Sequence, residues 1–363
     1  MEHQWRLGVL GLGEGRSILS AAINSPMWQV AQICDLNEDL CKERMAEFGL
    51  TRYTLSYEEM LRDPSVDVIG IYTPDPLHHQ HIRMALSAGK HVICTKPLMV
   101  SLEGAAELLE AQRQSGKAVM VGQSSRYFEA TMKQREDFEA GRHGELVTVE
   151  TQYISDSRWF LKRDWSHQKG FSWLYNFMIH AVDLAVWYLP RVEEVFAMGV
   201  TSANSEEYGI HCPDSLKALL RDEAGHTASV MGGYATPSFK TAVESSISCT
   251  LRGTRGISRG GSALQYYRKF LPEIPDTQII DFSEKKDYYD RFGNGSHHAG
   301  EYQNYIEYFA RCLNQGITPK PDLAEGIRTL AVMEAIERSI ETHEMVRVSQ
   351  ILQENGLREN YIS

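Results

Sequence analysis

In the first third of the chain, short apolar runs alternate with segments whose apolar residues recur at helical spacing. The apolar runs have strand length, and the predicted strands are Leu7 to Leu10, Val30 to Cys34, Val66 to Tyr72, His91 to Cys94 and Ala118 to Val121. The predicted helices between them are Ser17 to Asn24, Glu38 to Phe48, Leu77 to Ser87 and Leu102 to Ser115. This order favours a parallel, doubly wound sheet with right-handed crossovers. We therefore predict an N-terminal α/β domain over residues 1–122.

The pattern changes after Gly122, where the regular alternation of strands and helices stops. The helices predicted beyond this point are residues 128–140, 174–189, 301–313 and 323–342. Segments that alternate between apolar and polar positions are residues 145–153, 195–200, 215–220, 227–232 and 242–251. Such alternation is typical of antiparallel sheets with one covered face. We expect a second α/β domain over residues 123–363, built on a large open, mainly antiparallel sheet.

The composition narrows the class of partner. With 363 residues, 42% of them hydrophobic and 23% charged, the chain is typical of a globular protein with two domains. The net charge of -11 disfavours nucleic acids and anionic membranes, so a polar or neutral small molecule is the expected partner. The chain lacks a signal-peptide pattern and any apolar run near the roughly 18 residues of a membrane helix, which predicts a cytoplasmic protein. Six scattered cysteines without CxxC spacing predict reduced thiols and no metal site.

A glycine loop, GLGEGR, follows the first predicted strand. Gly11 and Gly13 lie between a strand and a helix, so the loop amides, that of Leu12 included, can hold a pyrophosphate together with the helix amino terminus. Gly15 relieves crowding at the start of this helix. Arg16 occupies the third glycine position of GxGxxG and is a candidate phosphate contact.

Asp35 ends the second predicted strand, 24 residues after Gly11. This is near the spacing at which a carboxylate accepts hydrogen bonds from the ribose hydroxyls of a dinucleotide. A carboxylate repels a 2'-phosphate, so we expect NAD to be preferred over NADP. The alternative interpretation is a solvated aspartate that caps the following helix.

The triplet Thr95-Lys96-Pro97 closes a buried strand. The carboxyl end of a strand is where an open α/β sheet presents chemistry to a ligand. An ammonium group beside a reacting hydroxyl lowers the pKa of that hydroxyl and stabilises the developing alkoxide. Lys96 is therefore a candidate catalytic residue, and the alternative is a surface lysine that follows a strand.

Several motifs occur together in order along the chain: GLGEGR, ICD, YTPDPLHH, AGKHVICTKPL and VGQSSRY, with PKPDLAEGIRTLAVMEAIERSI near the end. The combination resembles the Gfo/Idh/MocA family, the glucose-fructose oxidoreductase and inositol dehydrogenase group, over nearly the whole chain. The resemblance implies a Rossmann NAD-binding domain followed by a substrate-binding domain whose open sheet forms the interface of a homo-oligomer. It also implies oxidation or reduction of a sugar or cyclitol hydroxyl.

The resemblance assigns roles to three catalytic candidates. Lys96 matches the lysine of the family's EKP motif, which touches the substrate hydroxyl near the nicotinamide, and Thr95 replaces the glutamate. In GFSWLYNFMIHAVD, Asn176 and His180 are four residues apart on a predicted helix, with Asp183 one turn beyond His180. His180 is the candidate general base because imidazole exchanges protons near neutral pH. Asn176 stands where many relatives have aspartate, and its amide can orient a sugar hydroxyl but cannot take a proton.

Further contacts follow from the same resemblance. Thr73 and Pro74 match a loop beside the nicotinamide ribose, and His78 matches the histidine of that loop. Arg126 and Tyr127 match a family position that lines the active-site cleft. The other candidate substrate contacts are Arg158, Trp165, Asn176 and His297. Apart from Asn176, the alternative for each of these residues is a role in packing or at the surface. No metal site is expected from His79 and His81. Side chains one or two positions apart on a helix point in different directions, and no carboxylate completes a set of ligands.

These observations predict an NAD-dependent dehydrogenase of a sugar, glycoside or cyclitol. His180 would accept the hydroxyl proton and Lys96 would polarise the oxygen, while a hydride passes to the nicotinamide. Asn176 and the aromatic residues around it favour oxidation of a glucoside at carbon 3. One alternative is an NAD-dependent glycosidase, in which transient oxidation at carbon 3 enables elimination without net NADH. Another is a non-catalytic NAD-binding sensor, because Thr95 and Asn176 replace acidic residues.

Overall fold

The computed structural model describes residues 3–168, 170–239, 245–262, 266–282 and 300–357. These residues divide into two compact units. Unit 1 consists of residues 3–124 and 300–327, and unit 2 consists of residues 125–282 and 328–357. The chain first passes from unit 1 to unit 2 after residue 124, close to the expected boundary at residue 122. The division differs near the end of the chain, where residues 300–327 return to unit 1 rather than staying with the second domain.

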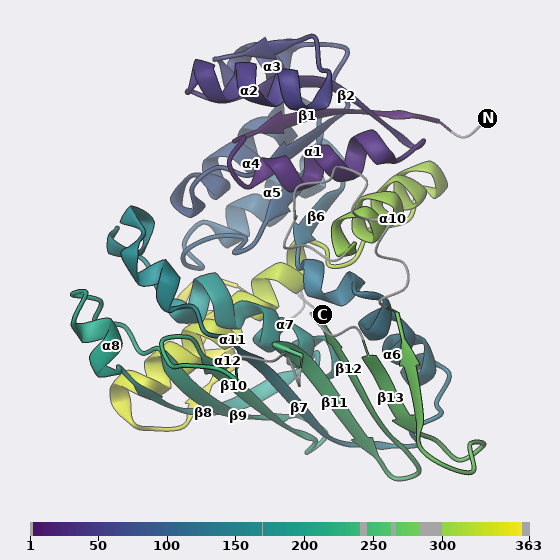
Figure 1. Cartoon of the computed structure of the whole chain (residues 1–363), viewed down its shortest axis with the longest axis vertical. Coiled ribbons are helices and arrows are strands. Elements are labelled where there is room, and N and C mark those ends of the chain that lie inside the picture. Colours follow the sequence, from purple (N-terminus) through teal and green to yellow (C-terminus); the bar gives the residue numbers. More distant parts are fainter. Residues whose placement is uncertain (1–2, 169, 240–244, 263–265, 283–299, 358–363) are drawn as a thin grey trace. The chain divides into compact units, whose positions relative to one another are not determined.

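Within the described residues, unit 1 holds a six-stranded sheet in the order β3-β2-β1-β4-β5-β6 (Figure 1). The strands are β1 (Trp5–Leu10), β2 (Trp28–Cys34), β3 (Tyr53–Thr54), β4 (Val68–Ile71), β5 (His91–Thr95) and β6 (Val119–Gly122). All neighbouring pairs are parallel, which confirms the predicted doubly wound sheet. The strand order reverses between β1 and β4, and ligands of such sheets bind outside the carboxyl ends of the strands at this point.

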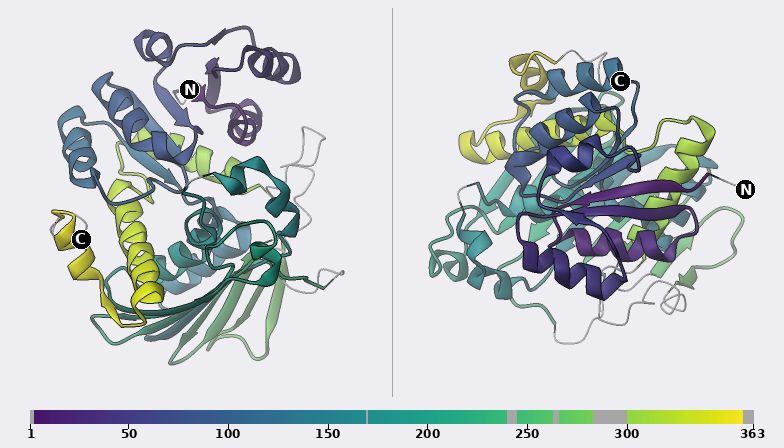
Figure 2. Two further views of the ribbon diagram at one scale, coloured as in Figure 1. Left: turned by 90° about the vertical axis from the view of Figure 1, so that its left-hand side faces the viewer. Right: turned by 90° about the horizontal axis from the view of Figure 1, so that it is seen from above.

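Helices cover both faces of this sheet. The helices of unit 1 are α1 (Gly15–Asn24), α2 (Glu38–Phe48), α3 (Tyr57–Arg62), α4 (His78–Ser87), α5 (Ala105–Ser115) and α10 (Glu301–Gln315). In Figure 2, α1 and α2 lie on one face of the sheet and α4 and α5 lie on the other. The helix α2 begins where the Asn37 side chain accepts the Leu40 amide hydrogen, and it ends at Gly49, whose φ is 64°.

Helix α10 belongs to unit 1 because it packs against α1 and covers an aromatic residue of β2. The indole nitrogen of Trp28 donates to the carbonyl of Ile306 at 2.9 Å. The ring of Trp28 also stacks on Phe309 with a centroid distance of 6.2 Å. All three residues are buried, so residues 300–327 complete the core of unit 1.

Within the described residues, unit 2 holds a nine-stranded sheet in the order β14-β13-β12-β11-β7-β10-β9-β8-β15. The strands are β7 (Leu146–Ile154), β8 (Val192–Val200), β9 (Ser215–Asp222), β10 (Thr227–Gly233), β11 (Ile247–Gly253), β12 (Ile257–Ser262), β13 (Tyr266–Phe270), β14 (Gln278–Asp281) and β15 (Val346–Arg347). The pair β7 and β10 is parallel, and the other pairs are antiparallel. The predicted large, mainly antiparallel sheet is thus confirmed.

One face of the nine-stranded sheet is covered by helices. The helices of unit 2 are α6 (Glu129–Glu139), α7 (Ile179–Tyr188), α8 (Ala203–Glu206) and α12 (Val348–Glu354), together with most of α11 (Leu323–Thr342). Figure 1 shows α6, α7 and α12 on the same side of the sheet. In the part of the chain that the structure describes, no helix covers the opposite side, which we call the outer face. No helix in that part is long and apolar enough to cross a membrane.

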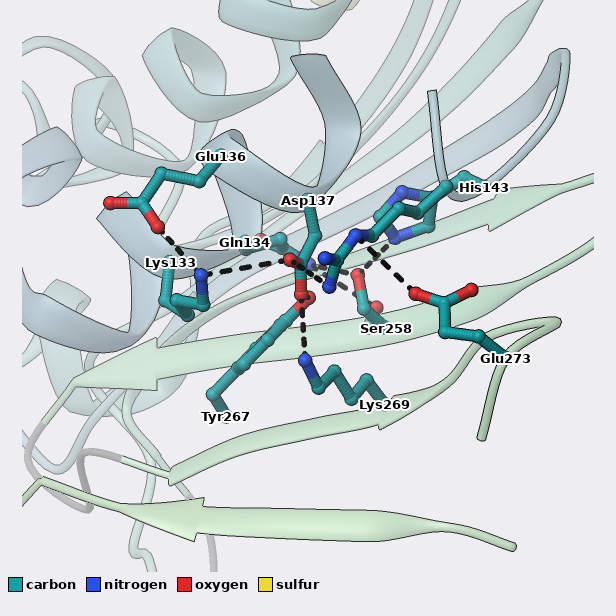
Figure 3. A network of polar contacts seen from close by, with 10 residues as sticks. Lys133, Gln134, Glu136, Asp137, His143, Ser258, Tyr267, Lys269 and Glu273 are labelled. Atoms are coloured by element: carbon teal, nitrogen blue, oxygen red, sulfur yellow. Dashed lines mark hydrogen bonds and ion pairs between the residues drawn. The ribbon is translucent and has the colours of Figure 1, made fainter. Parts of the chain in front are cut away.

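A buried polar network holds α6 to the sheet (Figure 3). The carboxylate of Asp137 accepts hydrogen bonds from the Tyr267 hydroxyl at 2.8 Å and from the Lys269 ammonium at 3.0 Å. Gln134, one turn earlier on α6, donates to the carbonyls of Cys249 and Ser258 at 3.0 and 3.2 Å. Because a buried charge is costly without a partner, the mutual pairing of Asp137 and Lys269 is what permits both to leave water.

Candidate functional site

The glycine loop of unit 1 joins β1 to α1, and its glycines leave the backbone without side chains at three positions. Gly11 has a φ of +86°, and a side chain there would place its Cβ 2.5 Å from the carbonyl oxygen of Tyr72. Only glycine fits that conformation and that contact. At Gly13, by contrast, a Cβ would meet no atom of the described residues within 4 Å. A Cβ at Gly15 would lie 3.0 Å from the Val9 side chain, so this glycine lets α1 pack closely on β1.

Asp35 and the glycine loop lie together. The carboxylate of Asp35 accepts hydrogen bonds from the amide of Leu12 at 2.8 Å and from the amide of Asn37 at 2.9 Å. These bonds fix the carboxylate beside the loop, at the end of β2. Arg16 instead points to α2, where its Nε donates to Glu47 at 2.7 Å. Its predicted phosphate contact therefore competes with an ion pair and stays a prediction.

A nicotinamide dinucleotide fits this arrangement. The left-handed Gly11 backbone leaves the loop amides close to the start of α1, which is how such loops approach a pyrophosphate. Asp35 supplies carboxylate oxygens one strand away, where a ribose would be held. The residues that would hold the dinucleotide are thus Gly11, Leu12, Gly13 and Asp35.

Lys96 follows β5 directly, at the same carboxyl edge of the sheet. Burial lowers the pKa of its ammonium group, while Asp75 and Glu14 favour the charged form and oppose that shift. Glu14 belongs to the glycine loop after β1 and Asp75 follows β4, so the loops after two strands place negative charges near this lysine. The neighbouring Thr95 side chain hydrogen-bonds Tyr302 of α10.

The other residues assigned to the cofactor, Thr73, Pro74 and His78, lie in the segment that follows β4. His78 is fully buried, and its two ring nitrogens lie 2.8 Å from the carbonyl oxygens of Pro97 and Thr73. It thus ties the loop after β4 to the loop that carries Lys96. The Thr73 hydroxyl lies 2.9 Å from a ring nitrogen of His81, and Pro74 is exposed. The cofactor contacts assigned to these residues stay predictions.

Asn176 and His180 belong to unit 2. The chain forms a π-helical turn over Leu174–Met178 before α7 begins at Ile179, so the predicted continuous helix over residues 174–189 is divided. Asn176 is buried in that turn, and its side-chain oxygen accepts the Ser172 amide hydrogen at 3.1 Å. π-helical turns are rare and often mark functional sites.

His180 stands at the beginning of α7, beside residues from two other elements. Its Nδ1 lies 2.7 Å from the hydroxyl oxygen of Ser125. The ring of Tyr153, on β7, meets the imidazole edge to face at a centroid distance of 5.8 Å. An imidazole held in this way can exchange a proton through its other nitrogen.

Arg126 and Asp183 form a buried ion pair. The Arg126 guanidinium donates to both oxygens of Asp183, at 2.7 and 2.8 Å, and the two side chains are 3% and 1% exposed. The Thr329 hydroxyl donates to the same carboxylate at 3.1 Å. The guanidinium of Arg126 thus belongs to the framework that supports α7, and its predicted contact with the substrate stays a prediction.

The remaining substrate candidates are dispersed. Tyr127 is buried, and Arg158 is exposed and paired with Asp156 at 2.6 Å. Trp165 packs edge to face against Phe160 at a centroid distance of 5.1 Å, within an aromatic cluster of its own segment. The substrate contacts predicted for these residues stay predictions. His297 lies outside the described residues.

Four residues near the candidates were not singled out from the sequence: Glu14, Asp75, Ser125 and Tyr302. Ser125 lies within the VGQSSRY motif, but its partner is 55 residues away, so no local spacing links the two. Tyr302 lies far from Thr95 along the sequence and reaches it through the packing of α10. Among the described residues, no three His, Cys, Asp or Glu side chains form a metal-binding group.

Two curated enzymes are similar to almost the whole chain. The D-xylose 1-dehydrogenase (NADP(+)) 2 of Haloferax volcanii is 24% identical over 339 residues, which cover 92% of this chain and 97% of that enzyme. The trans-1,2-dihydrobenzene-1,2-diol dehydrogenase of Mus musculus is 25% identical over 354 residues, which cover 94% of this chain and 97% of that enzyme.

Solved structures show the same fold. The structure of levoglucosan dehydrogenase in complex with NADH and levoglucosan superposes with a TM-score of 0.82 at 20% identity, covering 95% of this chain and all of that one. An oxidoreductase from Agrobacterium radiobacter, in complex with NAD+, L-tartaric acid and magnesium, gives a TM-score of 0.83 at 20% identity, with 96% of this chain and all of that one covered.

Family models account for both units. The model of the Gfo/Idh/MocA oxidoreductase family with an NAD-binding Rossmann fold matches residues 5–123. The model of the family's C-terminal alpha/beta domain matches residues 135–348. Together with the glycine loop, Asp35 and the lysine after β5, these matches confirm the resemblance inferred from the motifs. The chain belongs to the Gfo/Idh/MocA family of NAD-binding oxidoreductases.

Proposed function

We propose that this chain is an NAD-dependent dehydrogenase that oxidises a hydroxyl group of a sugar, glycoside or cyclitol. The observation that carries the proposal is the position of Lys96, a partly buried lysine at the same carboxyl edge as the glycine loop and Asp35. Similarity to a xylose dehydrogenase and to a dihydrodiol dehydrogenase supports a CH–OH substrate.

In the proposed mechanism, a bound dinucleotide supplies the acceptor for the hydride that leaves the carbinol carbon. Lys96 donates a hydrogen bond to the hydroxyl oxygen and stabilises the negative charge that develops on it. His180 removes the hydroxyl proton, so that the alcohol loses one hydride and one proton and becomes a ketone. Asn176 orients a neighbouring hydroxyl and takes no part in proton transfer, because an amide does not titrate in this range.

We propose carbon 3 of a glycoside as the oxidised position. Two features support this position: Asn176 stands where the family resemblance implies an aspartate, and an aromatic segment precedes it in unit 2. An amide can orient the hydroxyls of a sugar ring by hydrogen bonds, but, unlike a carboxylate, it cannot act as a second base. Mass and NMR analysis of the oxidised product, starting from a methyl glucoside, would identify the carbon, and a ketone at any other carbon would refute this assignment.

We propose that NAD is preferred over NADP because Asp35 is held beside the glycine loop by two backbone amides. A 2'-phosphate at that position would meet a fixed negative charge. Asp35→Ser should therefore raise the ratio of kcat/KM for NADP to that for NAD, chiefly through KM. Glu38→Ser, an exposed change on the nearby helix α2, is the control and should leave the ratio unchanged. An unaltered ratio in the Asp35 variant would show that other residues select the cofactor.

The direct test is a single turnover. The purified full-length chain is mixed with a stoichiometric amount of NAD and with one member of a panel: glucosides, free hexoses, D-xylose or inositols. Reduced-nicotinamide absorbance should appear with particular sugars and be lost in His180→Ala. Cleavage of a glucoside without net NADH would favour an NAD-dependent glycosidase instead. If the chain binds NAD but reacts with no member of the panel, and if Lys96→Ala leaves the affinity for NAD unchanged, the result would favour a sensor.

We also propose that the chain forms a homo-oligomer through the outer face of unit 2. The apolar side chains of Phe196, Met198, Val200 and Leu219 are exposed on β8 and β9. A depression of about 330 Å³ beside them is lined by Phe196, Leu219 and Met345. Exposed apolar patches of this kind mark interaction surfaces.

We place the protein in the cytoplasm, which is consistent with six cysteines that form no disulfide.

A further inference from the structure

Two consecutive residues join the short 3-10 helix Ser124–Tyr127 to α7. Ser125 contacts the Nδ1 of His180 at 2.7 Å, and Arg126 binds Asp183 at 2.7 and 2.8 Å. Because residues three apart in an α-helix are neighbours on one face, His180 and Asp183 present adjacent sites to this short helix. The serine therefore reaches the imidazole from a segment that is anchored one residue further on.

The anchor is stronger than an ordinary surface contact. Arg126 and Asp183 are nearly excluded from water, so neither charge can exchange its partner for solvent. The Thr329 hydroxyl binds the same carboxylate, and the Trp187 ring lies 5.2 Å below the guanidinium carbon. Both sides of the ion pair are thus fixed by further contacts. Ser125 is 1% exposed, so its hydroxyl is held where water cannot replace it.

We propose that Ser125 is a positioning residue that orients His180 and accepts the hydrogen of its Nδ1, which selects one tautomer of the ring. The inference rests on the proposed function, in which His180 is the base. A neutral imidazole carries one N–H, and a base needs the other nitrogen unprotonated. When Nδ1–H donates to the Ser125 oxygen, the lone pair that takes the substrate proton is on Nε2. If Ser125 donated instead, Nε2 would carry the hydrogen and could not act as the base.

The tautomer is measured on the full-length chain without any substrate. Nitrogen-15 NMR of histidine-labelled protein separates protonated from unprotonated ring nitrogens, and a His180→Gln spectrum identifies the signals of His180 among the 13 histidines. The expected result is a protonated Nδ1 in the neutral ring of the wild type, and a mixture of tautomers in Ser125→Ala. Ser124→Ala, the neighbouring buried serine, is the control and should match the wild type.

Kinetics of the same variants complete the test. Ser125→Ala should lower kcat by roughly 10-fold to 100-fold with little change in the KM for NAD, because a misoriented base slows the chemical step more than cofactor binding. Ser125→Thr, which keeps the hydroxyl, should recover part of the loss. Equal kcat in Ser125→Ala and wild type, or an Nε2–H tautomer in the wild type, would overturn the inference. A wild type that turns over no member of the sugar panel refutes the proposed function instead, and the NMR result then decides the inference alone.

Discussion

Lys90 and Lys96 stand at opposite ends of β5, and burial lowers the pKa of both ammonium groups. Lys90, at the amino end, donates to the carbonyls of Asp63 and Val66 at 2.9 and 2.6 Å. Those bonds satisfy backbone groups, which is a structural task. Lys96 lies at the carboxyl end, where the charges nearby belong to side chains of two loops. The same type of residue therefore has a structural role at one end of the strand and, in our proposal, a catalytic role at the other.

The two lysines should respond differently to the same substitution. Lys96→Met should lower kcat/KM by roughly 10²-fold to 10³-fold, as loss of one donor to a developing oxyanion does, with little change in NAD affinity. Lys90→Met should instead lower the free energy of unfolding, because the buried carbonyl of Val66 loses the donor that Lys90 provides. Steady-state kinetics, NAD titration and urea unfolding of both variants distinguish the two roles. A Lys90 variant as inactive as the Lys96 variant would contradict this division.

At the residue scale, the sequence indicated those groups whose chemistry depends on a local motif. Asp35 and Lys96 each follow a strand, and the structure places both at the carboxyl edge of the sheet with the glycine loop. The partners of the candidates were not predictable in the same way. Ser125 and Tyr302 are defined by contacts across long stretches of chain, and a serine or tyrosine has no signature that tells which neighbour it will meet.

At the element scale, two polar links hold neighbouring segments together. One is the network around Asp137, which ties α6 to β12 and β13 (Figure 3). The other joins β5 to β6, where the amide of Ala118 donates to Nδ1 of His91 at 3.1 Å. Asp137 is buried and His91 is partly buried, so each link couples the packing of an element to the charge of a titratable side chain.

Asp137→Asn should lower the free energy of unfolding by about 3–5 kcal/mol, because it leaves the buried Lys269 ammonium without its counter-charge. Lys133→Ala removes a more exposed member of the same network, 3.7 Å from Asp137, and should cost less than about 1 kcal/mol. Urea unfolding followed by tryptophan fluorescence measures both. Equal losses in the two variants would show that burial does not set the strength of this network.

His91 should make stability depend on pH. Burial, with a smaller effect of Lys117, lowers the pKa of His91 to about 4, below the value near 6.5 of an unfolded histidine. As the pH falls, the unfolded chain binds a proton first, so the contribution of His91 is present above about pH 6.5 and is lost towards about pH 4. His91→Asn keeps an acceptor for Ala118 and should lose less stability over that range than the wild type. The exposed His343→Asn is the control, and a wild-type slope in His91→Asn would contradict the assignment.

The helices and strands of both cores were predictable because their apolar residues recur with a regular period. Helix α11 has the predicted bounds, and most others differ at their ends by a few residues. The short β12 to β14 were missed, since glycine and polar residues interrupt their alternation. The parallel pairing of β7 and β10 was also missed. A period of two residues is the same in parallel and antiparallel strands, so the pattern carries no information about direction.

At the scale of the whole molecule, the proposed homo-oligomer gives the outer face a role that can be tested. Leu219→Glu should convert the proposed homo-oligomer to a smaller species, because Leu219 is 61% exposed among apolar neighbours and a carboxylate there would be buried on association. Ile317→Glu, at a similarly exposed position (53%) in unit 1, should leave the mass unchanged. Light scattering coupled to size-exclusion chromatography measures both. A monomeric wild type would refute the proposed interface.

The return of residues 300–327 to unit 1 has a consequence for biosynthesis. A ribosome releases the amino-terminal strands early, yet α10, which covers Trp28 of β2, emerges only after nearly all of unit 2. Domains usually fold as units in the order of synthesis. Here the unit that starts first is completed only at residue 327, after residues 125–282 of unit 2 have been synthesised. Until then the nascent chain exposes an uncovered indole, so a chain truncated before residue 300 would be prone to aggregation and a ready client for chaperones.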